Sequence, residues 1–484
     1  MNKNMNIVFL VTTLLVVNAL LNCSPINLLI TIPQFVYVLH LVQKKKYEQA
    51  VYFHLIFIAT SFSYNLSENA LDSLGVDSLT SYNYSKFKIA SIPLFFINTV
   101  VILVVLNKNK YCISNQARKS DFYKFYIFLK YTFISGAILG FIGLLCFGYF
   151  LEGFITYGSY AFFLLVTAYM LLLLYNSELS KKLYEAIPIL LIVSIIVLVL
   201  LEFGGLPYIG SAYITYFSAL LLPYSLYEKR VVVPIITLLI YMVFNLIIGT
   251  GGKTIIHFIM IFIAVFFITF NKKIPVSLRK IKKYRMFYYM LIVLLPICGI
   301  YILSNAMGDR ESNFMYKLHN VQTMFGFVFG LNGIYGIDRS PYIRIAEFLN
   351  IMYEDLYNPF YLLFGRGFGG YYEDVLGLFN AVDISYSTFS NEQIIAKKYY
   401  TAHDAFVSIP MINGIIGMYL WIKTILSYMK NVYKNYLKLI VLPFLLLIYY
   451  FDSLIGLIGT MFMFASEYNI VNDLNKFKLF NTNK

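Results

Sequence analysis

Residues 1–25 read MNKNMNIVFLVTTLLVVNALLNCSP, and this stretch sets the class of the fold. A basic start precedes an apolar run, which is the pattern of a signal peptide or of a first membrane helix. The tetrapeptide Leu20-Leu21-Asn22-Cys23 resembles a lipoprotein cleavage box, but Asn22 is too large and too polar for such a box. We therefore expect an uncleaved first helix.

Apolar windows of this kind recur along nearly the whole chain. Its 484 residues are 60% hydrophobic and only 13% charged, unlike a soluble domain. Because a helix needs about 20 apolar residues to cross the hydrocarbon core, we expect an all-α polytopic membrane protein with about 14 transmembrane helices. The predicted helices cover residues 6–22, 26–43, 49–63, 89–106, 131–150, 157–175, 187–203, 210–227, 231–248, 254–270, 286–305, 405–427, 439–455 and 457–471. The last pair could instead be one long tilted span.

The formal net charge of +14 reflects membrane topology and not nucleic-acid binding. Lysine and arginine gather in alternate loops, whereas the short loops between them contain few, with Lys86, Lys88 and Lys253 as the exceptions. Cytoplasmic loops carry this excess, so both termini are expected in the cytoplasm. The basic loops are residues 44–46, 108–130, 181–182, 229–230, 272–285 and 430–438.

This topology divides the chain into three parts. Residues 1–305 hold the first eleven helices, residues 306–403 form one large loop outside the cytoplasm, and residues 404–484 hold the last helices and a cytoplasmic tail. The large loop is rich in tyrosine, phenylalanine, leucine and isoleucine, which is not the composition of a disordered segment. Long loops that are not disordered are usually functional, so we expect this loop to fold over the membrane and carry the site.

Within the loop, residues 336–375 read GIDRSPYIRIAEFLNIMYEDLYNPFYLLFGRGFGGYYEDV. Apolar residues recur at helical spacing after Pro341, which suits a first turn, so Arg344 is expected early on an amphipathic helix ending near Asn358. A glycine-rich turn follows, containing Arg366 and Gly367. Such a backbone can approach a ligand closely, but a glycine cluster alone is more often an ordinary turn.

A second cationic element precedes the predicted helix at 254–270. Gly249, Gly251 and Gly252 leave Lys253 at the start of that helix, where the helix dipole and the lysine both favour an anion. The alternative is a lysine that simply reaches for water at the membrane border.

Residues 401–417 read TAHDAFVSIPMINGIIG and place His403 at the edge of an apolar stretch. By itself, such a histidine is more often a structural residue at the interface. Asp404 could orient His403 or cap the following helix.

Together these motifs resemble the superfamily of O-antigen ligases and Wzy-type O-antigen polymerases. The ligase pattern has His, then Asn, Ser or Gln, nine residues, Gly, two residues, and Gly, Thr or Tyr. His403, Gly414 and Gly417 stand at these spacings, and Asp404 departs from the neutral polar residue, which favours the more variable polymerases. The resemblance covers residues from about 249 to 420.

The resemblance implies a GT-C-like glycosyltransferase that joins undecaprenyl-diphosphate-linked oligosaccharides, both donor and acceptor, at the outer face of the bacterial inner membrane. It implies His403 as the base and Arg344 and Lys253 on the diphosphate, with Arg339 and Arg366 as further candidates. Asp404 could then hold a sugar hydroxyl of the substrate. No cofactor or metal is expected, and the four separated cysteines indicate neither a metal site nor a disulfide framework. Membrane lipids and a chain-length regulator are the expected partners.

Three other functions were weighed. An O-antigen ligase would transfer finished glycan to the lipid A core. A lipid-linked oligosaccharide flippase should show two similar halves and charged residues midway through several spans, and the sequence has neither. A non-enzymatic scaffold or chain-length protein rarely needs so many helices. The sugar, its linkage and the type of polymer are not encoded in any of these motifs.

Overall fold

The computed structural model describes residues 3–21, 24–61, 82–89, 92–203, 339–381, 389–430 and 456–467, with a few single positions between these stretches. The chain divides into two compact units. One comprises Met1–Tyr64, Ser78–Ile189 and Arg339–Lys484, and the other comprises Asn65–Asp77 and Leu190–Asp338. Nearly all described residues, including those around His403, belong to the first unit.

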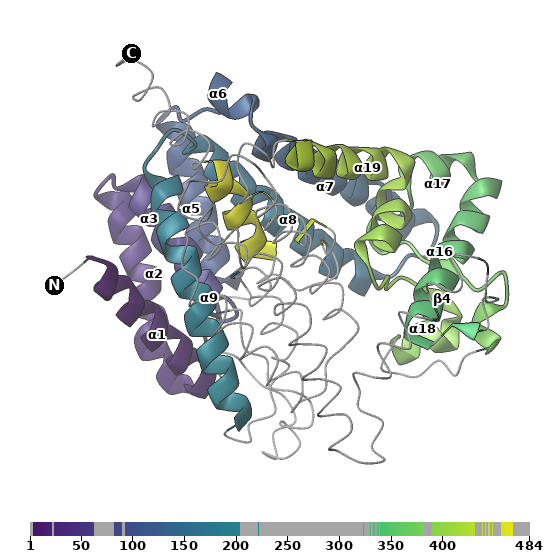
Figure 1. Cartoon of the computed structure of the whole chain (residues 1–484), viewed down its shortest axis with the longest axis horizontal. Coiled ribbons are helices and arrows are strands. Elements are labelled where there is room, and N and C mark those ends of the chain that lie inside the picture. Colours follow the sequence, from purple (N-terminus) through teal and green to yellow (C-terminus); the bar gives the residue numbers. More distant parts are fainter. Residues whose placement is uncertain are drawn as a thin grey trace, which may run out of the picture. The chain divides into compact units, whose positions relative to one another are not determined.

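The described N-terminal part is almost entirely helical (Figure 1). It comprises α1 (Lys3–Leu21), the short helical turn η1 (Pro25–Asn27), α2 (Leu28–Gln43), α3 (Tyr47–Ser61), the antiparallel pair β1 (Lys88–Ile89) and β2 (Ile92–Pro93), α5 (Leu94–Lys108), α6 (Asn115–Arg118), α7 (Asp121–Cys146), α8 (Leu151–Leu173) and α9 (Leu179–Phe203).

The C-terminal part combines one long helix with a small folded segment. Its elements are α16 (Arg339–Tyr357), α17 (Pro359–Phe364), β3 (Tyr372–Glu373), η4 (Leu378–Ala381), α18 (Asn391–Ala396), β4 (Lys398–Tyr399) and α19 (Ala405–Lys430). Strand β3 pairs antiparallel with β4, with Tyr372 opposite Tyr399.

Four helices of the described residues are long and apolar enough to cross a membrane: Pro25–Gln43, Asp121–Cys146, Leu151–Leu173 and Ala405–Lys430. This finding is consistent with the helical membrane protein that the composition predicts. The spans predicted at 210–227, 231–248, 254–270, 286–305 and 439–455 lie almost wholly outside the described residues.

Helix α7 begins ten residues before the predicted start at residue 131. Its N-cap is Ser120, whose side chain accepts a hydrogen bond from the N–H of Tyr123, and Asp121 in the first turn suits the helix dipole. The apolar window omits these first turns because Lys124 and Lys130 make them polar. The helix therefore extends beyond the segment that hydrophobicity alone detects.

A buried polar network ties α3 and α5 to the turn before β1. The ring of His54 lies 2.8 Å from the Tyr84 hydroxyl through Nδ1 and 2.9 Å from the Thr99 hydroxyl through Nε2. His54 is fully buried, so both ring nitrogens serve the packing of the fold. It is a structural histidine and provides a comparison for His403.

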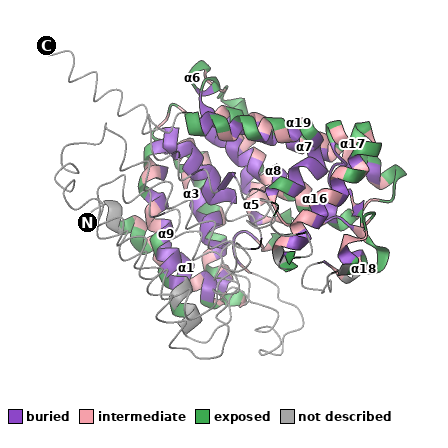
Figure 2. Ribbon diagram, turned by 45° about the vertical axis from the view of Figure 1, so that its right-hand side comes forward, coloured by how far each residue is buried: buried purple, intermediate pink, exposed green. Residues whose placement is uncertain are grey.

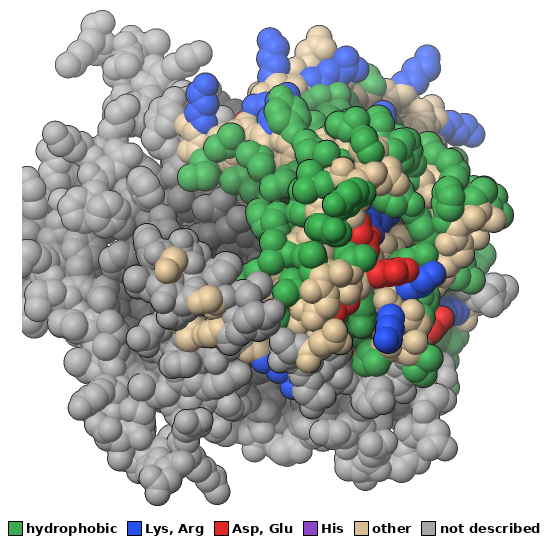
Figure 3. All heavy atoms as spheres, turned by 90° about the vertical axis from the view of Figure 1, so that its right-hand side faces the viewer, with side chains coloured by type: hydrophobic (Ala, Val, Ile, Leu, Met, Phe, Trp, Pro, Cys, Tyr) green, Lys and Arg blue, Asp and Glu red, His purple; other side chains and the backbone are tan. Residues whose placement is uncertain are grey.

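Helices α7 and α19 run antiparallel, and their basic ends meet. The ammonium of Lys124 donates to the hydroxyl of Ser427, which joins the first turn of α7 to the last turns of α19. Arg118, Lys119 and Lys430 are exposed at the same end. Lys and Arg side chains line the upper edge of the face in Figure 3, above a largely hydrophobic area. At 1.5 Å per residue, the 26 residues of α19 place His403 up to about 39 Å from this basic end.

Candidate active site

Helix α16 is the helix predicted around Arg344. Pro341 lies in its first turn, where the missing N–H costs no helical hydrogen bond. Ile343 and Ala346 lie on the buried side of this helix. Asn358 ends the helix and caps the next one, because its side chain accepts hydrogen bonds from the first N–H groups of α17. The predicted helix and its predicted end are both confirmed.

His403 is held by a buried carboxylate that the sequence patterns did not indicate. Its Nδ1 lies 2.5 Å from Oε1 of Glu347, and its backbone N–H lies 3.4 Å from Oε2 of the same group. The Glu347 side chain is fully buried, whereas that of His403 is 20% exposed. A buried carboxylate is costly unless donors satisfy it, and the hydroxyl of Tyr372 adds a third donor at 3.1 Å.

This arrangement favours one tautomer of the imidazole. Burial, together with the nearby charge of Glu347, raises the pKa of Tyr372 well above its usual value, so its hydroxyl stays protonated and donates. With a carboxylate at Nδ1, the neutral ring carries its proton on Nδ1 and its lone pair on Nε2. A ring in this state can accept a proton at Nε2, and the carboxylate then stabilises the imidazolium.

Arg344 forms a second contact between α16 and the residues that begin α19. Its Nε lies 2.9 Å from Oδ2 of Asp404, with the two side chains 28% and 32% exposed. The backbone carbonyl of Asp404 accepts from the N–H groups of Val407 and Ser408 and so begins α19. Asp404 thus occupies the N-cap position by its backbone, while its carboxylate binds Arg344.

The two contacts are adjacent on both elements. Arg344 and Glu347 lie one turn apart on α16, and His403 and Asp404 are consecutive at the start of α19, so two charged contacts join the same faces. The rings of Phe348 and Phe406 pack beside them with centroids 4.8 Å apart. In the sequence, Glu347 could have been noticed because it lies one helical turn after Arg344. That spacing does not predict His403 as its partner.

The glycine-rich turn packs into the groove between α7 and α19. The N–H groups of Arg366 and Gly367 donate to the carbonyls of Met411 and Ile412 at 2.8 and 2.9 Å. Gly367 has φ of 80°, and a Cβ there would lie 2.2 Å from the backbone nitrogen of Gly140. Only glycine fits this close approach. Gly367 therefore holds backbone against backbone in this structure.

The glycine spacing after His403 has a related cause. Helix α19 is kinked at Gly414, whose φ of 60° and ψ of −162° are not helical. A Cβ on Gly414 would lie 2.5 Å from the backbone of Leu363, at the end of α17. The kink stands next to the carbonyls that receive the glycine turn. Gly414 thus lets α17 and the turn pack against α19.

Arg366 belongs to a buried ionic cluster. Its NH1 donates to Glu354 and to the carbonyl of Tyr371, both at 2.5 Å, and its NH2 donates to Asp355 at 2.7 Å. Its side chain is 2% exposed. Burial raises the pKa of both carboxyls; burial lowers that of Arg366, but the two carboxylates more than offset this and raise it. These contacts indicate a structural role.

Arg339 and Lys253 are the two remaining predicted cations. Arg339 is the first residue of α16, and five positions correspond to about 140° around a helix, so it does not share the face of Arg344. Lys253 lies outside the described residues. The structure therefore brings together His403, Asp404 and Arg344 from the predicted set, and adds Glu347.

We expect Arg366→Met to destabilise the protein, because removing one partner of a buried ion pair typically costs about 3–5 kcal/mol. The triple variant with Glu354→Gln and Asp355→Asn should recover most of the loss. The pKa of both carboxyls is raised, so the folded state binds their protons more tightly than the unfolded state, and the single variant should gain stability as the pH falls from about 7 to about 5. Thermal unfolding in detergent measures this, and an unchanged midpoint in the single variant would contradict the structural role.

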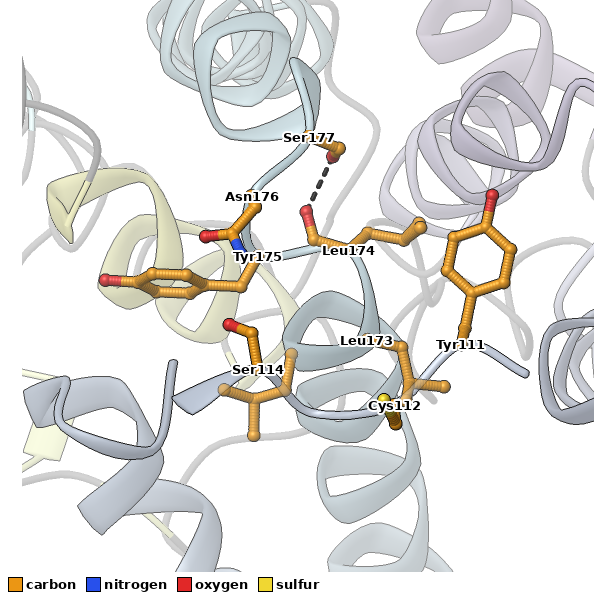
Figure 4. A pocket seen from close by; sticks show the side chains of 9 residues that line it. Tyr111, Cys112, Ser114, Leu173, Leu174, Tyr175, Asn176 and Ser177 are labelled. Carbon is orange, nitrogen blue, oxygen red and sulfur yellow. Dashed lines mark hydrogen bonds between the residues drawn. The ribbon is translucent and has the colours of Figure 1, made fainter. Parts of the chain in front are cut away.

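A pocket of about 260 Å³ lies far from these residues along α8 (Figure 4). It is formed where α8 ends and the chain turns toward α9, and the Ser177 hydroxyl donates there to the carbonyl of Leu174. Its lining contains none of the predicted site residues and no charged side chain: Tyr111, Cys112, Ser114, Leu172, Leu173, Leu174, Tyr175, Asn176 and Ser177. It offers no chemistry comparable to the cluster at His403.

No family model matches this chain, and neither a curated protein nor a solved structure matches it. The function must therefore be argued from the residues and their geometry.

Proposed function

We propose that this chain is a membrane glycosyltransferase that polymerises undecaprenyl-diphosphate-linked oligosaccharide repeat units into O-antigen or a related surface polysaccharide. The observation that carries the proposal is the double contact that joins Arg344 and Glu347 of α16 to Asp404 and His403. Such a transfer needs a base for the attacking hydroxyl and a fixed cation for the departing diphosphate. Both kinds of group stand in one partly exposed cluster.

In the proposed reaction, Nε2 of His403 accepts the proton of a sugar hydroxyl on the acceptor repeat unit. The hydroxyl oxygen bonds to the anomeric carbon of the donor glycan, the bond from that carbon to the diphosphate oxygen breaks, and undecaprenyl diphosphate leaves. Glu347 stabilises the imidazolium that forms, and Arg344 stabilises the charge on the leaving group. Lys253 would add a second cation. Arg366 and Gly367 support the fold around the site.

The proposal includes the finer topology. The chain has about 14 spans in a GT-C-like arrangement in the inner membrane, both termini in the cytoplasm, and residues 306–403 outside. Its support in the structure is the separation along α19, where exposed basic residues mark one end and His403 stands before the other. A membrane that crosses α19 would put these ends on opposite sides.

Deleting the gene tests the class of function. We expect cells that lack the protein to keep single repeat units on the outer side and to lose long glycan ladders. Loss of a ligase would instead leave ladders stranded on the carrier lipid, and loss of a flippase would leave repeat units facing the cytoplasm. Either of these patterns would replace the polymerase with the corresponding alternative.

Glu347 is proposed as a positioning residue that acts through His403. Glu347→Gln keeps an oxygen at Nδ1 but loses the charge that stabilises the imidazolium, so we expect an activity loss of about 10²-fold at normal abundance. Glu347→Asp keeps the carboxylate and should retain part of the activity. Equally low activity in both variants would instead indicate a purely structural role.

A further inference from the structure

A row of large hydrophobic side chains lies on the exposed side of α16 and α17. On each helix the first member is followed by a consecutive pair three and four residues later, and the row continues past the break at Asn358 and Pro359. Their exposed fractions range from 37% to 75%. We call this row the outer stripe; its members are Tyr353, Leu356, Tyr357, Phe360, Leu363 and Phe364.

Several polar side chains of α16 are buried. Glu347, Asn350 and Asp355 are at most 2% exposed and point into the small folded segment, where hydrogen bonds satisfy them. The helix thus buries carboxylates and exposes tyrosine and leucine. In water, a contiguous exposed patch of this kind would be unfavourable, and such patches mark contact with a partner or with lipid.

The outer stripe adjoins the exposed surface of a candidate membrane span. Helix α17 packs against α19 at the kink, where the Leu363 backbone meets Gly414. Beyond the kink, α19 exposes its own apolar row at a spacing of three or four residues, comprising Ile415, Tyr419, Ile422, Leu426 and Met429. Figure 2 shows exposed positions along both α17 and α19, and the face in Figure 3 is largely hydrophobic.

We propose that the second half of α16 together with α17 lies in the membrane–water interface, with the outer stripe against the lipid acyl chains. Lipid is the occupant that the continuity with α19 favours, because a spanning helix already presents the same kind of row to the hydrocarbon. The tyrosines of the stripe suit the border, since aromatic residues with a polar tip concentrate there.

This placement has a consequence for the site but does not depend on the proposed reaction. Arg344 precedes Leu356 by twelve positions, or about 18 Å along α16. An anchored α16 would therefore hold the Arg344 and His403 cluster within reach of phosphate groups carried on membrane lipids. The anchoring itself can be tested on protein without any activity.

Tryptophan quenching in lipid vesicles tests the placement. Trp421 is the chain's one tryptophan and is buried, with its Nε1 donating to the carbonyl of Leu445. In a Trp421→Phe background, Tyr357→Trp and Leu363→Trp report on the outer stripe, and Tyr419→Trp reports on α19. Ile395→Trp is the matched control, because Ile395 is 83% exposed but lies on α18, off the stripe. The probes are brominated phosphatidylcholine and aqueous acrylamide.

We expect both stripe variants to be quenched by the brominated lipid to an extent similar to Tyr419→Trp, and only weakly by acrylamide. Ile395→Trp should show the reverse. Quenching of the stripe variants by acrylamide alone would overturn the proposal, and protection from both quenchers would overturn it in favour of a protein partner. If Trp421→Phe lowers abundance, the same variants are measured with Trp421 retained and the wild-type signal subtracted.

Discussion

His403→Ala is expected to give a protein that reaches the membrane at normal abundance but supports only single repeat units. The ring that accepts the proton in the proposed reaction is lost, and base catalysis typically contributes about 10²- to 10⁴-fold in rate. The contact of the ring with Glu347 is also lost, but the backbone N–H of residue 403 and the Tyr372 hydroxyl still donate to that carboxylate, so the fold should tolerate the change. Glycan ladders on gels and membrane abundance, measured in the same cells, separate catalysis from folding.

His54→Ala is the matched control for this experiment. The rings of both histidines make hydrogen bonds. His54 is fully buried, and its two ring nitrogens contact neutral hydroxyl groups, whereas Nδ1 of His403 contacts the carboxyl group of Glu347. Its loss should lower abundance, and the protein that remains should keep its ladder-forming activity. A wild-type ladder in His403→Ala at normal abundance would remove His403 from the site.

Arg344→Ala is expected to abolish polymer almost completely, because in the proposed reaction the departing diphosphate loses its fixed cation. Arg344→Lys should keep only a little activity, since lysine retains the charge but loses the planar fork that binds two oxygens. Ladder length in complemented deletion cells measures both, with abundance as the reference. Full activity in the alanine variant would exclude Arg344 from the proposed site.

Arg339→Ala tests the choice between the two arginines of α16. Arg339 lies about 140° around the helix from Arg344, whose Nε binds Asp404. We expect a much smaller loss than for Arg344→Ala. A larger loss would instead indicate that the diphosphate binds at the first turn of α16.

Several features followed from the sequence alone. Composition predicts a helical membrane protein, because lipid removes long apolar runs from water and a helix satisfies their backbone groups there. The spacing of apolar residues after Pro341 predicted α16, and local chain chemistry decides such an element. His403 and Asp404 were found through their distance from Gly414 and Gly417, but the spacing gave no reason for the glycines.

Tertiary structure decided which groups meet. Glu347 and His403 are 56 residues apart, and their contact depends on how α16 packs against the start of α19. The same packing explains Gly414, because only the approach of α17 requires a residue without Cβ there. The sequence made Arg366 a candidate for substrate binding, but in the structure its guanidinium is buried against Glu354 and Asp355. Helical periodicity shows that α16 has two faces, but the contacts between distant segments determine which face is buried, and those contacts are not local properties of the chain.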